Sequence, residues 1–291
     1  MSEELIGLIG GSGLGEVLAE HITEAKTEDI DTPFGKPSAP VLIGTMGARK
    51  IAFLNRHGEG HLLAPSQVPY AANIFALKKL GVRSIIASCA VGSLQEEIRP
   101  KDLIVVDQFI DKTFRRQGSF FGNIAAVHCE LAHPCCSRLR KNILEVAQKI
   151  STKTHDGGTY VCMEGPQFST RAESLMHRQW GGDLIGMTAM PEAKLAREAQ
   201  ICYGLIAMAS DYDCWKTHDL SITKQALLEE IIGNLQEATN NAIELIKALL
   251  RSEGGLCDDN CGCRKSLELA VWSKPGRINE GNKQKLAVLF E

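Results

Sequence analysis

Short hydrophobic runs alternate along the chain with longer segments in which hydrophobic residues recur at helical spacing. The runs at 5–9, 82–88 and 205–210 are short and mostly apolar, as buried strands are. Residues 69–80 and 138–150 instead have apolar positions three and four residues apart, which predicts helices. This alternation predicts an α/β fold with a largely parallel sheet.

The same criteria place further elements. Residues 41–43 and 50–54 are expected to form a hairpin, and Thr170 with Glu173 forms a capping box at the start of a helix. Pro191 is expected to be the first residue of a helix that ends near Tyr203. The remaining expectations are strands at 103–110, 159–163 and 184–187 and one long helix at 223–251.

The domain organisation follows from length and composition. The 291 residues are 44% hydrophobic and 23% charged, which is typical of a globular protein long enough to bury a large core. No internal repeat, low-complexity segment or linker precedes Gly254. We therefore expect one domain over residues 1–253, and a C-terminal extension over 254–291 that packs on the same domain.

The charge balance limits the partners. Against 32 Lys and Arg stand 35 Asp and Glu, so the net charge of −3 gives no electrostatic reason to expect nucleic acid. Apolar stretches such as 103–106 are too short to span a membrane, and Glu3 and Glu4 do not fit a secretory signal. We expect a cytoplasmic protein without nucleic-acid or membrane partners, although a local pocket can still bind a small anion.

Ten cysteines are many for a cytoplasmic chain. Most stand singly in apolar runs, where a small buried hydrophobic residue is the expected role. Only Cys257, Cys261 and Cys263 are close in sequence, and they lack the second pair of ligands found in zinc signatures. The spacing therefore predicts no metal site.

A glycine-rich turn follows the first strand. From Gly11, the dinucleotide fingerprint Gly-x-Gly-x-x-Gly would need glycine where Glu16 stands, and no lysine follows to complete a phosphate loop. The turn and its hydroxyl, Ser12, can still present N–H groups to an anion. A tight turn without a ligand is the alternative.

Several polar residues follow other predicted strands. Arg56 and His57 come directly after one strand, where the donors of an arginine suit a phosphate. Residues 88–93 are small enough for a ligand to approach the backbone, although close strand packing explains them equally well. Residues 163–169 and 211–215 also follow strands, and ligands of open α/β sheets bind at the carboxyl ends of strands. Acids such as Asp211 can serve proton transfer there, or simply cap a turn.

Five blocks in this order resemble a known family. They are GGSGL at 10–14, DTPFGKP at 31–37, NRHG at 55–58, EGPQFSTRAE at 164–173 and AMASDYDCW at 207–215. With them, nearly the whole chain resembles the S-methyl-5'-thioadenosine phosphorylases, a branch of the trimeric purine nucleoside phosphorylase family. The resemblance implies a single-domain nucleoside phosphorylase fold, in which helices flank a central mixed β-sheet.

The resemblance also implies a reaction. A pentosyltransferase of this family catalyses reversible phosphorolysis of S-methyl-5'-thioadenosine to adenine and 5-methylthioribose 1-phosphate, in purine and methionine salvage. Inorganic phosphate is the co-substrate, and neither a cofactor nor a metal is implied. The implied assembly is a homotrimer in which a neighbouring subunit completes each site.

Site roles carry over residue by residue. The resemblance assigns phosphate to Ser12, Arg56, His57, the backbone around Ala90, and Thr188. It makes Asp211 the general acid at purine N7, with Ser169 and Asp213 helping to read the base and Phe168 stacking on it. Met187 would contact the ribose hydroxyls, His128 would reach the 5' group from a neighbouring subunit, and Ile222 would line the methylthio pocket with His61 nearby.

The acid at Asp211 carries the substrate preference. Related phosphorylases for 6-oxopurine nucleosides, such as inosine, guanosine and methylthioinosine, have asparagine there, so Asp211 indicates adenine. A 6-oxopurine phosphorylase is the alternative, and a non-catalytic nucleoside-binding protein is a further one.

Two positions depart from the family pattern. Cys89 stands where a hydroxyl often contacts phosphate, and a thiol is a weaker donor. Gly186 stands where relatives carry a side chain, which predicts looser substrate contacts. The tail also resembles the family, and heat-adapted members oxidise its cysteines to disulfides. For this chain we expect reduced thiols.

Overall fold

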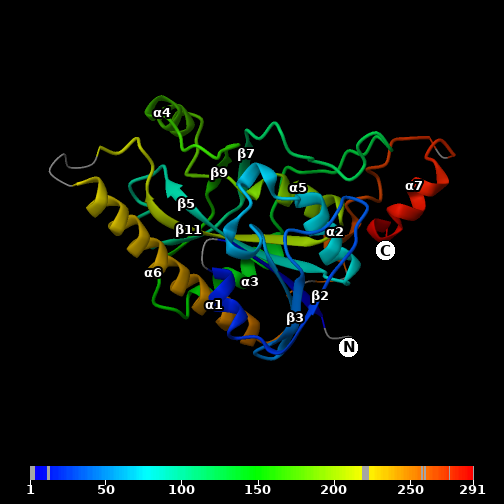
Figure 1. Ribbon diagram of the computed structural model, residues 1–291, viewed down its shortest axis with the longest axis horizontal. Coiled ribbons are helices and arrows are strands. Elements are labelled where there is room, and N and C mark those ends of the chain that lie inside the picture. Colours follow the sequence, from blue (N-terminus) through cyan, green and yellow to red (C-terminus); the bar gives the residue numbers. More distant parts are fainter. Residues whose placement is uncertain are drawn as a thin grey trace.

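Helices cover both faces of one central sheet (Figure 1). The computed structural model describes residues 4–11, 14–217, 223–256, 258, 260–274 and 276–290. Ser12, Ile222 and Cys257 therefore lie outside the described residues.

The strands are β1 (Leu5–Gly10), β2 (Thr23–Glu28), β3 (Val41–Met46), β4 (Arg49–Asn55), β5 (Ser84–Ser93), β6 (Leu103–Val105), β7 (Gln108–Asp111), β8 (Thr154–Asp156), β9 (Thr159–Cys162), β10 (Leu184–Gly186) and β11 (Cys202–Tyr212). The α-helices are α1 (Leu14–Ala19), α2 (Tyr70–Lys79), α3 (Ser137–Ala147), α4 (Arg171–Gln179), α5 (Ala189–Glu198), α6 (Lys224–Arg251) and α7 (Glu280–Lys285). Short 3-10 segments are η1 (Glu59–His61), η2 (Pro65–Gln67), η3 (Gly262–Lys265) and η4 (Ala287–Phe290).

The sheet is mixed and divides at β5. One path runs β2-β3-β4-β1-β5-β10-β9-β7, while β11 also pairs with β5 and leads to β6 and β8. Strands β4, β1, β5 and β11 are mutually parallel, so their carboxyl ends meet at one edge. The hairpin β3–β4 and the pairs β5–β10 and β6–β11 are antiparallel. The sheet is thus less parallel than the hydrophobic pattern suggested, because that pattern does not report strand direction.

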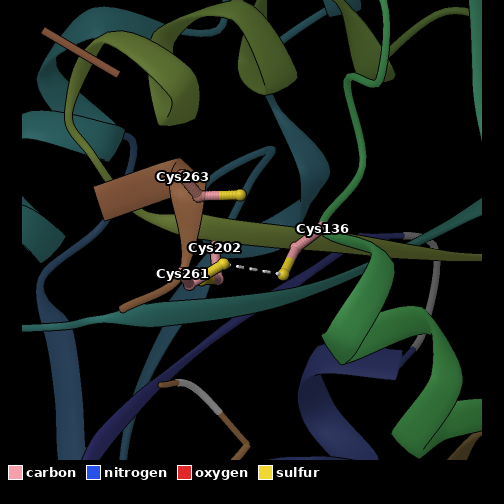
Figure 2. A group of neighbouring side chains, drawn as sticks. All are labelled: Cys136, Cys202, Cys261 and Cys263. Atoms are coloured by element: carbon pink, nitrogen blue, oxygen red, sulfur yellow. Dashed lines mark hydrogen bonds between the residues drawn. The ribbon is translucent and has the colours of Figure 1, made fainter. Parts of the chain in front are cut away.

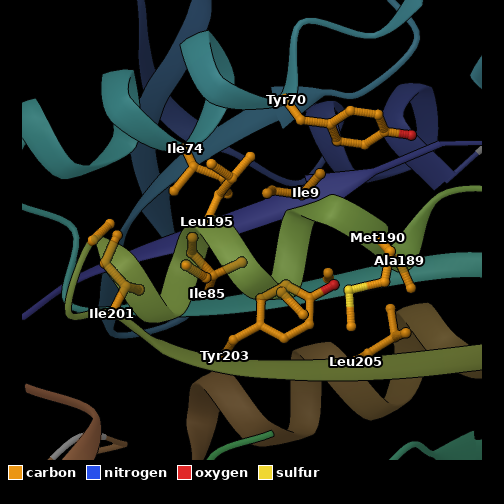
Figure 3. Close-up of a cluster of buried hydrophobic side chains, with 14 of the residues drawn as sticks. Ile9, Tyr70, Ile74, Ile85, Ala189, Met190, Leu195, Ile201, Tyr203 and Leu205 are labelled. Atoms are coloured by element: carbon orange, nitrogen blue, oxygen red, sulfur yellow. The ribbon is translucent and has the colours of Figure 1, made fainter. Parts of the chain in front are cut away.

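Both faces of the central strands are apolar, and side chains alternate between them. On β4, Ile51 and Phe53 face one core while Ala52 and Leu54 face the other. The first core lies under α1, α3 and α6, and the second under α2 and α5. Figure 3 shows the second core, where Leu195 of α5 lies above Ile85 of β5. This double burial explains why the sequence shows continuous apolar runs.

Most predicted elements are confirmed, but several boundaries differ. Helix α5 begins at Ala189 instead of Pro191, and β5 continues to Ser93, beyond the predicted end at residue 88. The Thr170 capping box and the Thr223 N-cap of α6 are both present. The expected strand at 103–110 is broken into β6 and β7, because Asp107 turns aside to accept a hydrogen bond from the Gly158 N–H at 2.8 Å. Helix α5 ends at Glu198, short of Tyr203, because Gln200 has a positive φ of 58° and β11 begins soon after it.

The segment after α6 packs on the rest of the chain. Leu256 and Cys263 belong to the core under α6, and Leu267, Ala270 and Leu289 belong to the core under α2 and α5. Among the described residues, no helix is long and apolar enough to cross a membrane.

Candidate active site

A cavity of about 540 Å³ opens at the edge where the parallel strands end. Its volume is in the range of small-molecule sites. Of the predicted site residues it brings together Arg56, His57, His61, Ala90, Phe168, Ser169, Met187, Thr188, Asp211 and Asp213. Ser12 and Ile222 lie outside the described residues.

His128 does not line this cavity in its own chain. Its ring packs edge-on against Trp272, with the ring centres 5.3 Å apart, and its backbone N–H donates to the Ala270 carbonyl. The resemblance places it at the site of a neighbouring subunit.

A β-bulge near the end of β11 aims the two acids. The pairing of β11 with β5 runs in register to Ala209 opposite Val91 and then shifts, so that Asp211 lies opposite Gly92. Bulges re-aim side chains where they interrupt a ladder. A Cβ on Gly92 would lie 3.3 Å from the Asp213 Cβ, so glycine at this position leaves room for that acid.

Arg56 is held by a buried acid that sequence reasoning missed. Its Nε and Nη2 donate to the two Glu192 carboxylate oxygens at 2.8 and 3.0 Å, and its Nη1 donates to the Ser88 carbonyl at 2.8 Å. Burial alone would lower the Arg56 pKa, but the ion pair raises it above its usual value. Because an arginine has five N–H donors, these bonds leave two for a ligand. The positive charge is already balanced by Glu192.

His57 is neutral in this setting. Burial, opposed only in part by its hydrogen bond with the Leu63 carbonyl and helped by the nearby Arg56, lowers its pKa to about 4. The Nδ1–H donates to that carbonyl at 2.8 Å. The neutral ring therefore presents Nε2 as an acceptor. The His57 ring stacks on the His61 ring, with the ring centres 4.2 Å apart.

The remaining groups at this end are mostly neutral. Burial raises the pKa of the Cys89 thiol to about 11, so it stays protonated. The Thr188 N–H donates to the Tyr160 hydroxyl at 3.3 Å. An anion would therefore meet N–H and O–H donors rather than an unbalanced cation.

The opposite end carries acids and an aromatic ring. The Ser210 hydroxyl donates to Asp211 Oδ1 at 2.6 Å. Asp213 is buried, and its Oδ2 has no hydrogen-bond partner among the described residues. Phe168 is 85% exposed and lies at the rim. A buried oxygen without a partner is costly unless a ligand or water satisfies it, which favours a donor-bearing ligand here.

Met187 is positioned by buried groups that the sequence did not reveal. Arg116 donates from Nη1 to the carbonyls of Met187 and Met190, both at 2.6 Å, and from Nε to Glu164 at 3.1 Å. A Cβ at Gly186 would collide with the Tyr160 hydroxyl. Glycine at 186 is thus required by close packing. The looser substrate contacts expected there stay a prediction.

Helix α6 supplies an apolar wall. Its Ile231 and Leu235 line the cavity together with Pro65. The helical pattern of the sequence predicted α6, but it did not predict which turn of the helix lines the cavity. Ile231 and Leu235 line the cavity, and three further residues contact its lining side chains or backbone: Arg116, Glu192 and Tyr160. All were missed because local patterns do not report contacts made in the folded chain.

Comparisons with known proteins identify the family. The model of the phosphorylase superfamily matches residues 5–251. An S-methyl-5'-thioadenosine phosphorylase of Cereibacter sphaeroides is 45% identical over 94% of this chain and 92% of its own. One from Geobacter sulfurreducens is 43% identical over 99% of this chain and 98% of its own.

Solved structures extend the likeness to the fold. A methylthioadenosine phosphorylase from an Antarctic soil metagenomic library superposes with a TM-score of 0.88, at 39% identity and over all of both chains. The methylthioadenosine phosphorylase of Schistosoma mansoni in complex with adenine has a TM-score of 0.78 and 34% identity, over 85% of this chain and 91% of its own.

Proposed function

Because the chain belongs to the phosphorylase superfamily, and within it to the S-methyl-5'-thioadenosine phosphorylases, we propose that it cleaves S-methyl-5'-thioadenosine with phosphate. The products are adenine and 5-methylthioribose 1-phosphate, and the reaction is reversible. The observation that carries the proposal is one cavity in which Arg56 contacts Ser88 while Asp213 lies beside Gly92, so that the anion donors and the acids are separated along β5.

Phosphate binds at the end formed by Arg56, His57, Ala90 and Thr188, with Ser12 completing the donors. Glu192 and Ser88 accept three of the five N–H groups of Arg56. The remaining two N–H groups can donate to the phosphate oxygens. His57 Nε2, as an acceptor, suits the O–H of the monohydrogen phosphate dianion. Such dispersed hydrogen bonds hold the anion without quenching it as a nucleophile.

The chemical step breaks the bond between ribose C1' and purine N9. A phosphate oxygen forms the new bond to C1' through an oxocarbenium-like transition state, while the bonding electrons leave with the base. Asp211 delivers a proton to N7, which neutralises the leaving adenine. The hydrogen bond from Ser210 holds the Asp211 carboxyl in place. Because phosphate is the nucleophile and a carboxyl group the acid, the reaction needs no cofactor.

Base and sugar recognition follow from the remaining residues. Asp213 Oδ2, buried and without a partner among the described residues, accepts a hydrogen bond from the adenine amino group, with Ser169 beside it. Phe168 stacks on the ring, and Met187 contacts the ribose. His61 and Ile222 take the methylthio end, and the apolar side chains of α6 extend that wall.

The proposal includes a homotrimer, a cytoplasmic location and a place in purine and methionine salvage. The trimer and the role of His128 at a neighbouring site rest on the family resemblance. The location rests on the apolar stretches of the sequence, which are too short to span a membrane.

A base-release assay tests the function. The chain is given methylthioadenosine, adenosine, inosine and methylthioinosine, each with and without phosphate. We expect phosphate-dependent adenine release that is fastest from methylthioadenosine. Faster cleavage of the 6-oxo substrates would overturn the adenine assignment, and equal release without phosphate would indicate a hydrolase.

The Asp211→Asn variant tests the acid within the same assay. Loss of a general acid lowers rates by about 10²–10⁴-fold, so kcat/KM for methylthioadenosine should fall by that range. Asp29→Asn removes an exposed carboxylate outside the cavity and serves as the control. An unchanged kcat/KM in Asp211→Asn would remove Asp211 from this role.

A further inference from the structure

Four cysteines from three distant segments meet on the face of the sheet covered by α3 and α6. Cys136 is the N-cap of α3, Cys202 is the first residue of β11, Cys261 is the N-cap of η3, and Cys263 lies within η3. Their sulfur atoms all lie within 4.8 Å of one another, and Cys136 and Cys261 are 3.6 Å apart. Figure 2 shows the side chains converging.

The group has the composition and size of a closed thiolate metal site. Four sulfurs around zinc at about 2.3 Å stand at tetrahedral corners about 3.8 Å from each other, so shifts of about an ångström or less would form the site. Soft sulfur ligands select zinc over magnesium or calcium. Cys136, Cys202 and Cys263 are buried and Cys261 half-buried.

We propose that Cys136, Cys202, Cys261 and Cys263 bind one zinc ion in a tetrahedral structural site. On binding, the thiols release their protons to solvent and the four thiolates coordinate the metal, leaving a net charge of 2−. Four protein ligands leave no open position for a substrate, so the metal holds structure rather than reacting.

The surroundings help to balance that negative charge. Cys136 stands at the N-terminus of the helix α3, whose free N–H groups and dipole favour negative charge. This position favours a thiolate at Cys136 in a place that is otherwise part of the hydrophobic core.

The position in the fold gives the site its role. Cys202 and Asp211 lie nine residues apart at the two ends of β11, which separates metal and chemistry by roughly 30 Å at the rise of a strand. The ion would fasten the segment after α6 to β11 and α3. That segment is also held by Leu256 in the core, by an exposed ion pair between Arg138 and Asp258, and by a hydrogen bond from the Ser266 hydroxyl to the Arg197 carbonyl.

Disulfide bonds are the competing chemistry for the same four residues. The 3.6 Å between Cys136 and Cys261 is well beyond a bond of about 2.05 Å. Moreover, each sulfur is near all three others, whereas disulfides need only two close pairs. The experiment therefore has to distinguish metal, disulfide and reduced thiols.

The test begins with the full-length chain, purified without a histidine tag, in reducing buffer and with zinc in the growth medium. We expect about one zinc per chain by elemental analysis, and cobalt substitution should give the charge-transfer and d–d bands of a tetrahedral thiolate site. Cys136→Ser and Cys263→Ser should each lower the zinc content, while Cys129→Ser, a half-buried cysteine outside the group, should retain it.

Removal of zinc by a chelator tests the structural role. We expect a lower Tm and faster proteolysis within residues 252–264, with kcat unchanged well below the Tm. A chain that stays free of zinc after zinc loading, with all ten thiols titratable after denaturation, would overturn the proposal. So would an intact mass, measured without reductant, that is lowered by the two hydrogens of each disulfide. The zinc content of the wild-type chain decides the proposal, so a cysteine variant that fails to fold does not affect the conclusion. The base-release assay tests the proposed function separately, because it does not depend on zinc content.

Discussion

Arg56 is held by buried contacts and still keeps N–H donors for the proposed phosphate. Its guanidinium is 1% exposed and pairs with the equally buried Glu192, which also accepts from the Tyr203 hydroxyl at 2.8 Å. A buried ion pair contributes little net stability, yet breaking it leaves a buried charge uncompensated. The pair is therefore best understood as a device that fixes where the remaining arginine donors point.

This arrangement changes how the role of Arg56 is tested. Arg56→Ala alone leaves Glu192 unpaired and should cost about 3–5 kcal/mol of unfolding free energy. In the double variant Arg56→Gln with Glu192→Gln both charges are gone, so its Tm should be higher than that of Arg56→Ala. Its KM for phosphate should rise by about tenfold or more, since hydrogen bonds to charged groups are worth about 1.5–3 kcal/mol. Initial rates against phosphate concentration give the KM, and an unchanged value would place the anion site elsewhere.

His57 predicts how stability responds to acid. Its pKa of about 4 in the folded chain lies below the ordinary 6.5, so both states are neutral above pH 6.5. As the pH falls from 6.5 towards 4, the unfolded chain binds the proton first and the free energy of unfolding decreases.

His57→Asn tests this prediction, because its amide nitrogen can replace Nδ1 as the donor to Leu63. Thermal unfolding is measured between pH 7.5 and 4. The Tm of the variant should fall less steeply with acid than that of the wild type, with His21→Asn as an exposed control. Parallel curves for wild type and His57→Asn would contradict a depressed pKa.

At the scale of elements, the residues of the candidate site are positioned by the ends of the parallel strands. The local patterns located most strands and helices, because apolar periodicity and capping residues act over a few positions. They did not locate the bulge in β11, which depends on its pairing with β5. They also did not show why position 186 is glycine, which is required by Tyr160 on the neighbouring strand β9.

Two glycine substitutions distinguish a glycine required by tertiary packing from one that is not. Gly186→Ala forces a methyl group into the Tyr160 hydroxyl and should cost about 1–3 kcal/mol of unfolding free energy. Gly233→Ala, on the exposed side of α6 with nothing near its missing Cβ, should instead stabilise by up to about 1 kcal/mol. Denaturant unfolding measures both. A Gly186→Ala chain as stable as the wild type would show that Tyr160 moves freely.

At the scale of the whole molecule, the open question is how copies assemble. Exposed apolar residues such as Phe114, Leu269 and Trp272 suit an interface. The proposed trimer also requires that His128 of one chain acts at the site of the neighbouring chain.

Mixed assemblies test that demand. Asp211→Asn and His128→Ala chains are each expected to have low activity alone. When they are unfolded and refolded together, some sites combine an intact Asp211 from one chain with an intact His128 from its neighbour, so activity should rise above the average of the two. Light scattering gives the assembly mass in parallel. Activity that merely averages would place His128 in its own chain's site or outside the site altogether.

The sequence by itself determined the α/β class, the family and a set of residues that the cavity largely gathers. It could do so because helical and strand periodicity, capping boxes and contiguous motifs are local properties of the chain. Which groups surround those residues was decided by the tertiary structure alone. Glu192 reaches Arg56 across 136 positions and Arg116 reaches Met187 across 71. Cys136 meets Cys261 across 125. No local sequence pattern predicts such long-range contacts. They depend on the order of the strands in the sheet and on the packing that brings the strand ends together.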